Sequence, residues 1–222
     1  MNYENIHIIE EPELLANARN PKGELGEKLI EKMNINHEGL AQWSLSHIKI
    51  TRNDKILDIG CGGGVNVHRF LQITDNIVYG LDYSKVACEK SCLMNEDAIC
   101  EGRCEIIQGS VSSMPFDDNT FDIVTAFETV YFWPDFLNDL KEVFRILKYD
   151  GMIFIANEAL PKENDERQME LIELLDMNIY SQEQLKDYLQ KAGFSDININ
   201  VKESRDSFTG EDADWICITA KK

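Results

Sequence analysis

The sequence predicts an α/β protein with a doubly wound sheet of about seven strands, mostly parallel, and an N-terminal helical lid. Three observations support this prediction. Short apolar runs, typical of buried strands, alternate with helical segments from residue 55 onward. The first run leads into the glycine-rich loop "GCGGG". The last two runs have no helix between them, so we expect a hairpin that adds an antiparallel strand.

The chain begins with segments of helical rather than strand character. Residues 1–20 are polar and mixed, and we expect a loose helix or arm there. Residues 23–50 carry apolar side chains at helical spacing, which predicts two helices separated near Asn34–His37. We therefore expect residues 1–50 to form a cap or lid and residues 51–222 to form the main domain.

The central part of the chain supplies the parallel strands. The predicted strands are residues 55–60, 76–82, 103–110, 121–128 and 151–158. Residues 181–194 then read as a helix, with Ser181 as its N-cap and Gly193 as its C-cap. Residues 196–204 and 214–222 are the two strands of the terminal hairpin.

Charge and hydropathy exclude several classes of partner. The 222 residues carry a formal net charge of −18, and no basic stripe is visible, whereas nucleic-acid binding needs clustered Lys and Arg. We expect a small-molecule partner, with a protein substrate as an open alternative. No run of about 18 apolar residues occurs, so we expect no membrane span. The N-terminus lacks the features of a secretory signal, which favours a cytoplasmic protein.

Four of the six cysteines are concentrated in a short segment. They are Cys88, Cys92, Cys100 and Cys104. Their C-x3-C spacing, separated by seven residues, is a poor match to structural zinc sites, which use closer pairs across a longer spacer. We therefore expect free thiols that pack as small apolar side chains, and no metal site.

The glycine-rich loop "ILDIGCGGGVNV" indicates a ligand, either a dinucleotide or another cofactor. The dinucleotide pattern G-x-G-x-x-G fails at its sixth position, which is Val65. Asp58 also opposes a pyrophosphate, since two like charges 4 Å apart repel by about 4 kcal/mol at an effective dielectric constant of 20. The same carboxylate suits a ligand that carries an ammonium and a sulfonium group.

Four segments together resemble the class I S-adenosylmethionine-dependent methyltransferases, with their Rossmann-like fold. "ILDIGCGGG" resembles their first motif, and "YGLDYS" resembles their second. "QGSVSSMPFDDNTFDIV" resembles the loop over the adenine and the following strand, and "FRILKYDGMIFIANE" resembles the turn into the fifth strand. The resemblance covers residues 55–158, in the order and spacing of the family.

The resemblance implies S-adenosylmethionine as cofactor and S-adenosylhomocysteine as product. It assigns the methionine portion to the glycine loop, the ribose hydroxyls to Asp82, the adenine to Tyr83 and the adenine loop, and the sulfonium region to Phe127 and Glu128. The implied cofactor-binding residues are Asp58, Gly60, Cys61, Gly62, Gly64, Asp82, Tyr83, Ser110, Val111 and Phe127. Ser110 departs from the aspartate that the family often has in the adenine loop, and "LKYDG" replaces the usual Pro-Gly turn.

A methyl acceptor is expected beyond the carboxyl ends of the strands. The residues expected to bind it are His37, Trp43, Tyr131 and Trp133. Weaker candidates for a catalytic role are Glu128, Tyr131, His47 and Glu158. Each of these side chains has a plain packing or surface interpretation as well, and a general base is needed only if the acceptor must lose a proton.

The leading hypothesis is methyl transfer from S-adenosylmethionine to a small molecule by in-line displacement, in which the protein mainly aligns the reactants. A non-catalytic module that senses or sequesters the cofactor is the alternative. An NAD-dependent oxidoreductase is opposed by Val65 and Asp58. The clustered cysteines also suggest metalloid methylation as a hypothesis, as in the related arsenite methyltransferases. They fall between the second and third strands, however, which places them away from the sulfonium.

Overall fold

A computed structural model describes residues 12–158, 160–162, 165–205 and 212–222. The expected arm at residues 1–20 lies mostly outside this part of the chain. The N-terminal helices are α1 (Pro12–Leu15), α2 (Gly23–Asn36) and α3 (Glu38–Leu45). The break between α2 and α3 at His37 confirms the predicted separation of the two helices.

A seven-stranded sheet follows, with the order β3-β2-β1-β4-β5-β7-β6. Its strands are β1 (Ile56–Ile59), β2 (Val78–Asp82), β3 (Cys104–Gln108), β4 (Phe121–Phe127), β5 (Leu147–Asn157), β6 (Ser195–Arg205) and β7 (Asp212–Lys221). β1 to β5 pair in parallel, and β7 runs antiparallel to both β5 and β6. The predicted doubly wound sheet with a terminal hairpin is therefore confirmed.

The remaining helices alternate with the strands. They are α4 (Val65–Leu71), α5 (Lys85–Met94), α6 (Glu96–Cys100), the 3-10 turn η1 (Val130–Phe132), α7 (Phe136–Ile146), α8 (Glu166–Leu175) and α9 (Gln182–Ala192). α9 begins with a full capping box, because the Ser181 side chain accepts from the Gln184 backbone and the Gln184 side chain accepts from the Ser181 backbone. Gly193 ends it in the left-handed conformation, as predicted.

Helices on both faces of the sheet bury two apolar clusters. Leu140 and Val143 of α7 and Leu185 of α9 pack in the cluster that also contains Leu57 and Val124 of the sheet. Leu40 of α3 and Phe70 of α4 belong to the second cluster, together with Ile56 and Ile123. Adjacent strand residues such as Ile56 and Leu57 therefore face opposite clusters, as the alternation of side chains along a strand requires.

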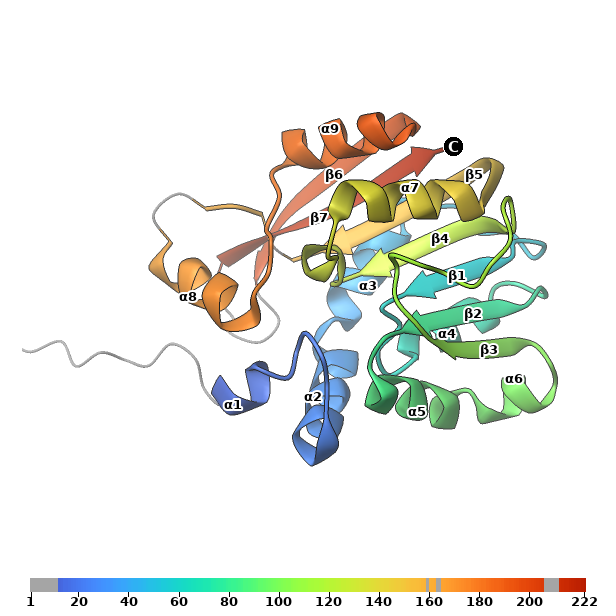
Figure 1. Cartoon of the computed structure of the whole chain (residues 1–222), viewed down its shortest axis with the longest axis horizontal. Helices are drawn as coiled ribbons and strands as arrows, with labels where there is room; N and C mark the ends of the chain where they lie inside the picture. Colours follow the sequence, from blue (N-terminus) through green and yellow to red (C-terminus); the bar gives the residue numbers. More distant parts are fainter. Residues whose placement is uncertain (1–11, 159, 163–164, 206–211) are drawn as a thin grey trace, which may run out of the picture.

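Two features differ from the sequence-based expectation. β5 begins at Leu147 rather than at residue 151, because the "LKYDG" segment pairs with β4 through an irregular register and Asp150 takes a positive φ of 62°. The second difference is α8, which had not been assigned a structure of its own. Figure 1 shows α1, α2 and α8 gathered at the edge where the parallel strands end.

Candidate functional site

The glycine-rich loop connects the end of β1 to the start of α4. The backbone N–H groups of Gly60 and Cys61 donate to the Leu81 carbonyl, at 2.7 and 3.1 Å. The Gly62 N–H donates to Oδ2 of Asp82 at 2.9 Å. Gly64 is the N-cap of α4 with φ of 80°, and a Cβ there would lie 2.3 Å from Oγ of Ser91. Only glycine fits at this position.

Asp82 joins this loop to the end of β2. Its Oδ1 accepts a hydrogen bond from the Ser84 N–H at 2.8 Å, and its Oδ2 holds Gly62. Burial raises the pKa of Asp82, whereas its backbone hydrogen bonds lower it. The neighbouring Tyr83 is 43% exposed, and burial of its hydroxyl together with the Asp82 charge raises its pKa to about 12.

A cavity lies over these residues. Gly60, Cys61, Gly62, Asp82, Tyr83 and Phe127 line it, all of them implied in cofactor binding by the sequence. We name it the cofactor cavity. Residues that had not been singled out also line it, notably Arg19, Asn34, Glu38 and Arg69. Arg69 forms an ion pair with Glu38, which ties α4 to the start of α3.

Four of the implied cofactor residues do not line this cavity. Gly64 instead packs against α5 through the close approach to Ser91. Ser110 is exposed and forms an isolated bridge with Ser113, and Val111 is buried in the core. The turn after β3 directs the Val111 side chain into the apolar cluster, and contact of Ser110 or of the Val111 backbone with the adenine stays a prediction.

Asp58 is the fourth of these residues. It is 2% exposed, and its Oδ1 accepts a hydrogen bond from the Thr125 hydroxyl at 2.6 Å across the β1–β4 pair. Its pKa is raised to about 7, because burial and the nearby Asp82 charge raise it by more than the Thr125 hydrogen bond and the Arg69 charge lower it. Asp58 therefore lies behind the loop rather than on the cavity wall.

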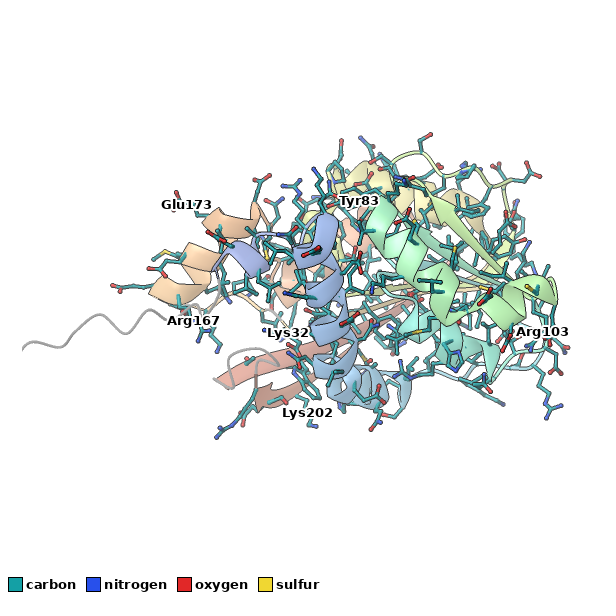
Figure 2. All side chains as sticks on the ribbon, turned by 90° about the horizontal axis from the view of Figure 1, so that it is seen from below. Lys32, Tyr83, Arg103, Arg167, Glu173 and Lys202 are labelled. Atoms are coloured by element: carbon teal, nitrogen blue, oxygen red, sulfur yellow. The ribbon has the colours of Figure 1, made fainter. Side chains whose placement is uncertain are left out.

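A second cavity lies beside the first, between the sheet edge and α8. Its polar residues include His37, Glu128, Tyr131 and Glu158. Its apolar wall consists of side chains from α1, α2, α8 and the segments around α8: Leu15, Leu29, Leu160, Leu171, Leu175 and Ile179. In both Figure 1 and Figure 2, α2 lies between α8 and α5, and residues of α2 line this cavity. We name it the acceptor cavity.

The two cavities share a wall. It is formed by Ala18, Met33, His37, Glu128 and Phe132. Shared lining residues mean that a ligand in one cavity lies directly beside a ligand in the other.

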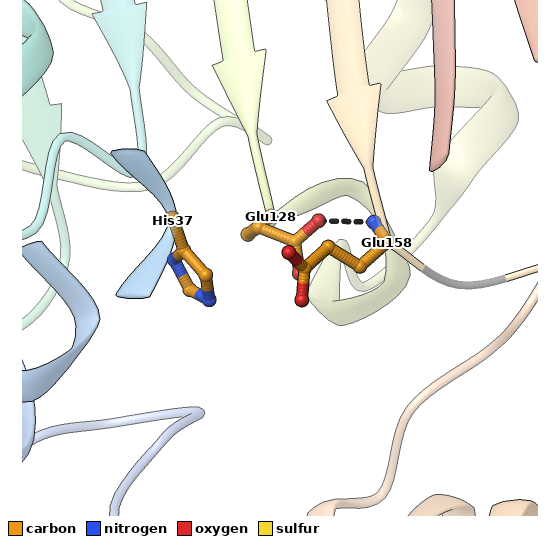
Figure 3. Close-up of side chains that lie close together, drawn as sticks. All are labelled: His37, Glu128 and Glu158. Atoms are coloured by element: carbon orange, nitrogen blue, oxygen red, sulfur yellow. Dashed lines mark hydrogen bonds between the residues drawn. The ribbon is translucent and has the colours of Figure 1, made fainter. Parts of the chain in front are cut away.

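Glu128 lies in this shared wall with a left-handed backbone conformation that several hydrogen bonds hold in place. Its φ is 54°, and its N–H donates to the Ala156 carbonyl at 2.9 Å. Its carboxylate accepts from the Tyr131 hydroxyl at 2.8 Å and from the Glu158 N–H. Figure 3 shows His37, Glu128 and Glu158 pointing toward one another from the α2–α3 junction, the end of β4 and the end of β5. A strained non-glycine residue held in this way is typical of functional sites.

Three other candidates lie away from both cavities. Trp43 and His47 contact each other with ring centroids 5.2 Å apart, and Trp43 lies 6.0 Å from the ring of Trp215. Trp133 is 3% exposed and packs 5.8 Å from Phe136 in the core. These three side chains stabilise α3 and η1 rather than contact an acceptor, which corrects their expected role.

The cysteines are all free, as expected. Cys61 lines the cofactor cavity, whereas Cys88 and Cys104 are buried and Cys92 and Cys100 are exposed. Among the described residues, no cysteine belongs to the group of side chains whose ligand atoms are close enough to hold a metal ion.

α8 and the residues that it brings to the acceptor cavity were not expected from the sequence. A signal was present, because Asp165 precedes the helical spacing of "ERQMELIELL" and its side chain accepts from the Gln168 N–H at 2.9 Å. Figure 2 shows Arg167 and Glu173 on opposite sides of this helix. Arg167 lines the acceptor cavity, whereas Glu173 is exposed.

Comparison with known proteins identifies the family. Residues 57–155 match the family model described as a methyltransferase domain. The uncharacterized methyltransferase YdaC of Bacillus subtilis is 25% identical over 86% of this chain and 95% of its own length. The protein named "Putative methyltransferase YrhH" of the same organism is 30% identical over 58% of this chain and 71% of its own length.

A solved structure agrees on the fold. Phosphoethanolamine N-methyltransferase 2 of Haemonchus contortus, in complex with S-adenosylmethionine, superposes with a TM-score of 0.77 at 15% identity, covering 96% of this chain and 60% of that one. The chain spans less than half the length of the plant sterol methyltransferases that it also matches.

Across the part of the chain that the structure describes, no helix has both the length and the apolar character needed to cross a bilayer. The glycine loop, the strand-end aspartate and the sheet order agree with the family match. The chain belongs to the class I S-adenosylmethionine-dependent methyltransferases, enzymes that transfer the methyl group of this cofactor.

Proposed function

We propose that the enzyme methylates a small molecule bound in the acceptor cavity, and that this molecule meets the methyl group where the two cavities adjoin, at the residues that line both: Ala18, Met33, His37, Glu128 and Phe132. The shared wall is the observation that carries this proposal, since in-line displacement needs donor and acceptor side by side. The acceptor cavity has a volume of about 160 Å³, comparable with a cavity of about 150 Å³ that holds a benzene-sized molecule.

The residues of the cofactor cavity fit S-adenosylmethionine. A Cβ at Gly62 would meet no atom of the described residues within 4 Å, so bare backbone faces the cavity there. Asp82 uses each carboxylate oxygen for one backbone hydrogen bond and retains lone pairs for ribose hydroxyls. Tyr83 offers a half-exposed ring for the adenine. When bound, the cofactor supplies a methyl group on a sulfonium, which is already activated for transfer.

The acceptor side supplies groups for binding and for proton transfer. Tyr131 and Glu128 form a hydrogen-bonded pair at the shared wall, and the Glu128 carboxylate is the group best placed to take a proton from an acceptor. The apolar wall from α2 and α8 excludes water from the reacting atoms. We propose that residues 1–50 act together with α8 as the lid.

Charge and cavity size favour a small acceptor over a macromolecule. The formal net charge of −18 opposes nucleic acid, and the acceptor cavity, with a volume of about 160 Å³, suits a small molecule. A cytoplasmic location remains our prediction from the sequence.

Calorimetric titration with S-adenosylmethionine, S-adenosylhomocysteine and NAD tests the cofactor part. We expect binding of the two sulfur ligands only. Asp82→Asn keeps the shape of the side chain and should lower the affinity about 10- to 100-fold, as expected when a hydrogen bond to a charged group is lost. Asp75→Asn, which alters an exposed aspartate, is the matched control. Binding of NAD alone would overturn the cofactor assignment.

Transfer of a labelled methyl group to a low-molecular-weight cell extract tests the acceptor part. Label should appear in molecules that pass a small-pore filter, and Glu128→Gln should reduce the transfer by a larger factor than it weakens binding of S-adenosylhomocysteine. Binding without any transfer would favour the alternative of a non-catalytic cofactor sensor. Label retained on protein would contradict a small acceptor.

A further inference from the structure

Three potential metal ligands converge on the shared wall from separate elements of the fold. They are His37 between α2 and α3, Glu128 after β4, and Glu158 after β5. One ligand atom from each lies within 4.8 Å of the others. Figure 3 shows that the imidazole and the two carboxylates face the same small space.

The group lies in a partly buried environment, and the acceptor cavity beside it is also lined by two cationic side chains, Lys162 and Arg167. Glu158 is 6% exposed, and His37 and Glu128 are half-buried. Like charges held close together in a site with little water repel each other, and a cation between them removes the repulsion. A metal ion between the two carboxylates would therefore lower their mutual repulsion.

The donor set indicates which cation fits. One imidazole nitrogen and two carboxylate oxygens suit Zn²⁺, Mn²⁺ or Fe²⁺, whereas Mg²⁺ and Ca²⁺ prefer oxygen alone. Three protein ligands also leave coordination positions open, as in catalytic rather than structural metal sites. His37 and Glu128 line both cavities and Glu158 lines the acceptor cavity, so the open positions face the ligand space.

The Glu128 carboxylate is already oriented by groups that are not ligands themselves. The Tyr131 hydroxyl donates to Oε2 at 2.8 Å, and the backbone N–H of Glu158 donates to Oε1. Hydrogen bonds of this kind fix the direction of metal-binding carboxylates in metal sites. A carboxylate offers about four acceptor sites on its two oxygens, so these two hydrogen bonds are compatible with a metal ion as a further partner.

We propose that His37, Glu128 and Glu158 bind one divalent first-row metal ion at the junction of the two cavities. Its role rests on the proposed function. The ion coordinates an oxygen or nitrogen of the methyl acceptor and fixes it beside the cofactor cavity. Coordination also lowers the pKa of a bound hydroxyl, so the acceptor loses its proton more readily before it attacks the methyl carbon. This proposal departs from our sequence-based expectation of no metal site.

The test uses the full-length protein without an affinity tag, stripped with a chelator. Mn²⁺ is titrated and free Mn²⁺ is followed by its electron paramagnetic resonance signal, with Zn²⁺ as competitor. We expect one Mn²⁺ per chain. His37→Ala and Glu158→Gln should each weaken binding at least about 100-fold, more than the loss of an outer hydrogen bond, and Tyr131→Phe about 10-fold.

His47→Ala is the matched control, because His47 is exposed at the end of α3 and lines neither cavity. Affinity for S-adenosylhomocysteine is measured on the same samples. Glu158 lies outside the cofactor cavity, so Glu158→Gln should bind this ligand like the wild type. This readout separates the two proposals, because loss of cofactor binding in the wild type contradicts only the proposed function.

Two results would overturn the metal site. One is wild-type protein that binds S-adenosylhomocysteine but binds neither Mn²⁺ nor Zn²⁺ at millimolar concentration. The other is metal binding that His37→Ala and Glu158→Gln leave unchanged. Calorimetric binding of methylammonium with no metal binding would instead assign the two carboxylates to an amine acceptor, and would refute the proposal.

Discussion

Gly62→Ala should separate cofactor binding from folding. Gly62 has φ of 52°, and a Cβ there meets no atom of the described residues within 4 Å. The stability cost is therefore only that of a left-handed alanine, about 1–2 kcal/mol. The new methyl group points into the cofactor cavity, so S-adenosylhomocysteine should bind about 10- to 100-fold more weakly, the equivalent of about 1–3 kcal/mol of overpacking.

Gly64→Ala, two residues away, provides the contrast. Its φ is 80°, and the added Cβ would lie 2.3 Å from Oγ and 2.9 Å from Cα of Ser91. Because Cα belongs to the backbone of α5, this helix must shift, and the combined ranges for overpacking and left-handed strain give about 2–5 kcal/mol of destabilisation.

Urea unfolding followed by tryptophan fluorescence measures the free energy of unfolding of both variants, and calorimetry measures the affinity for S-adenosylhomocysteine. We expect the wild type to be the most stable, Gly62→Ala to be less stable and Gly64→Ala to be the least stable. The reasoning would be refuted by a Gly62→Ala variant with wild-type affinity, since the cofactor would then not approach the loop. It would equally be refuted by a Gly62→Ala variant less stable than Gly64→Ala.

Three further predictions concern the core and the lid. Burial raises the pKa of Asp58 from 3.8 to about 7, so its protonated form stabilises the fold at low pH and this contribution is lost as pH rises from about 4 to about 7. Relative to Asp58→Asn, the wild-type free energy of unfolding should fall by up to about 4 kcal/mol across that range, and parallel pH profiles would contradict this. Arg19→Ala removes the ion pair with Asp176, which follows α8. We expect the free energy of unfolding to change by less than about 1 kcal/mol, but proteolytic cleavage within α8 to become faster. An unchanged cleavage rate would show that the ion pair does not hold the helix in place. Leu140→Ala leaves a cavity at a fully buried core position. It should lower the free energy of unfolding in urea by about 2–5 kcal/mol and leave the affinity for the cofactor unchanged. Reduced cofactor affinity in the folded variant would contradict this.

Most of the sheet was predictable because its signals are local. A buried parallel strand is a short apolar run, and the parallel strands, the N-cap at Ser181 and the terminal hairpin lie close to where the sequence predicts them, apart from the earlier start of β5. The irregular register near Asp150 was not predictable, since it depends on pairing with β4 rather than on the turn residues alone.

The acceptor side was predictable only in part. Glu128 and Glu158 are adjacent because they end neighbouring parallel strands, a relation that strand order determines. His37 joins them from a helix junction about ninety residues before Glu128, and no pattern among neighbouring residues in the sequence predicts such a contact. Trp43 and Trp133 show the opposite error, because an aromatic side chain in sequence looks the same whether it faces a ligand or the core.

By itself the sequence determined the fold class, the family and the cofactor, because the glycine loop and the strand-end Asp82 are fixed by backbone geometry over a few residues. Only the tertiary structure showed that Asp58 is buried behind the loop, that α8 completes a second cavity, and that this cavity shares a wall with the first. These features depend on how distant helices pack over the sheet edge. Packing is set by the whole apolar surface rather than by any one segment.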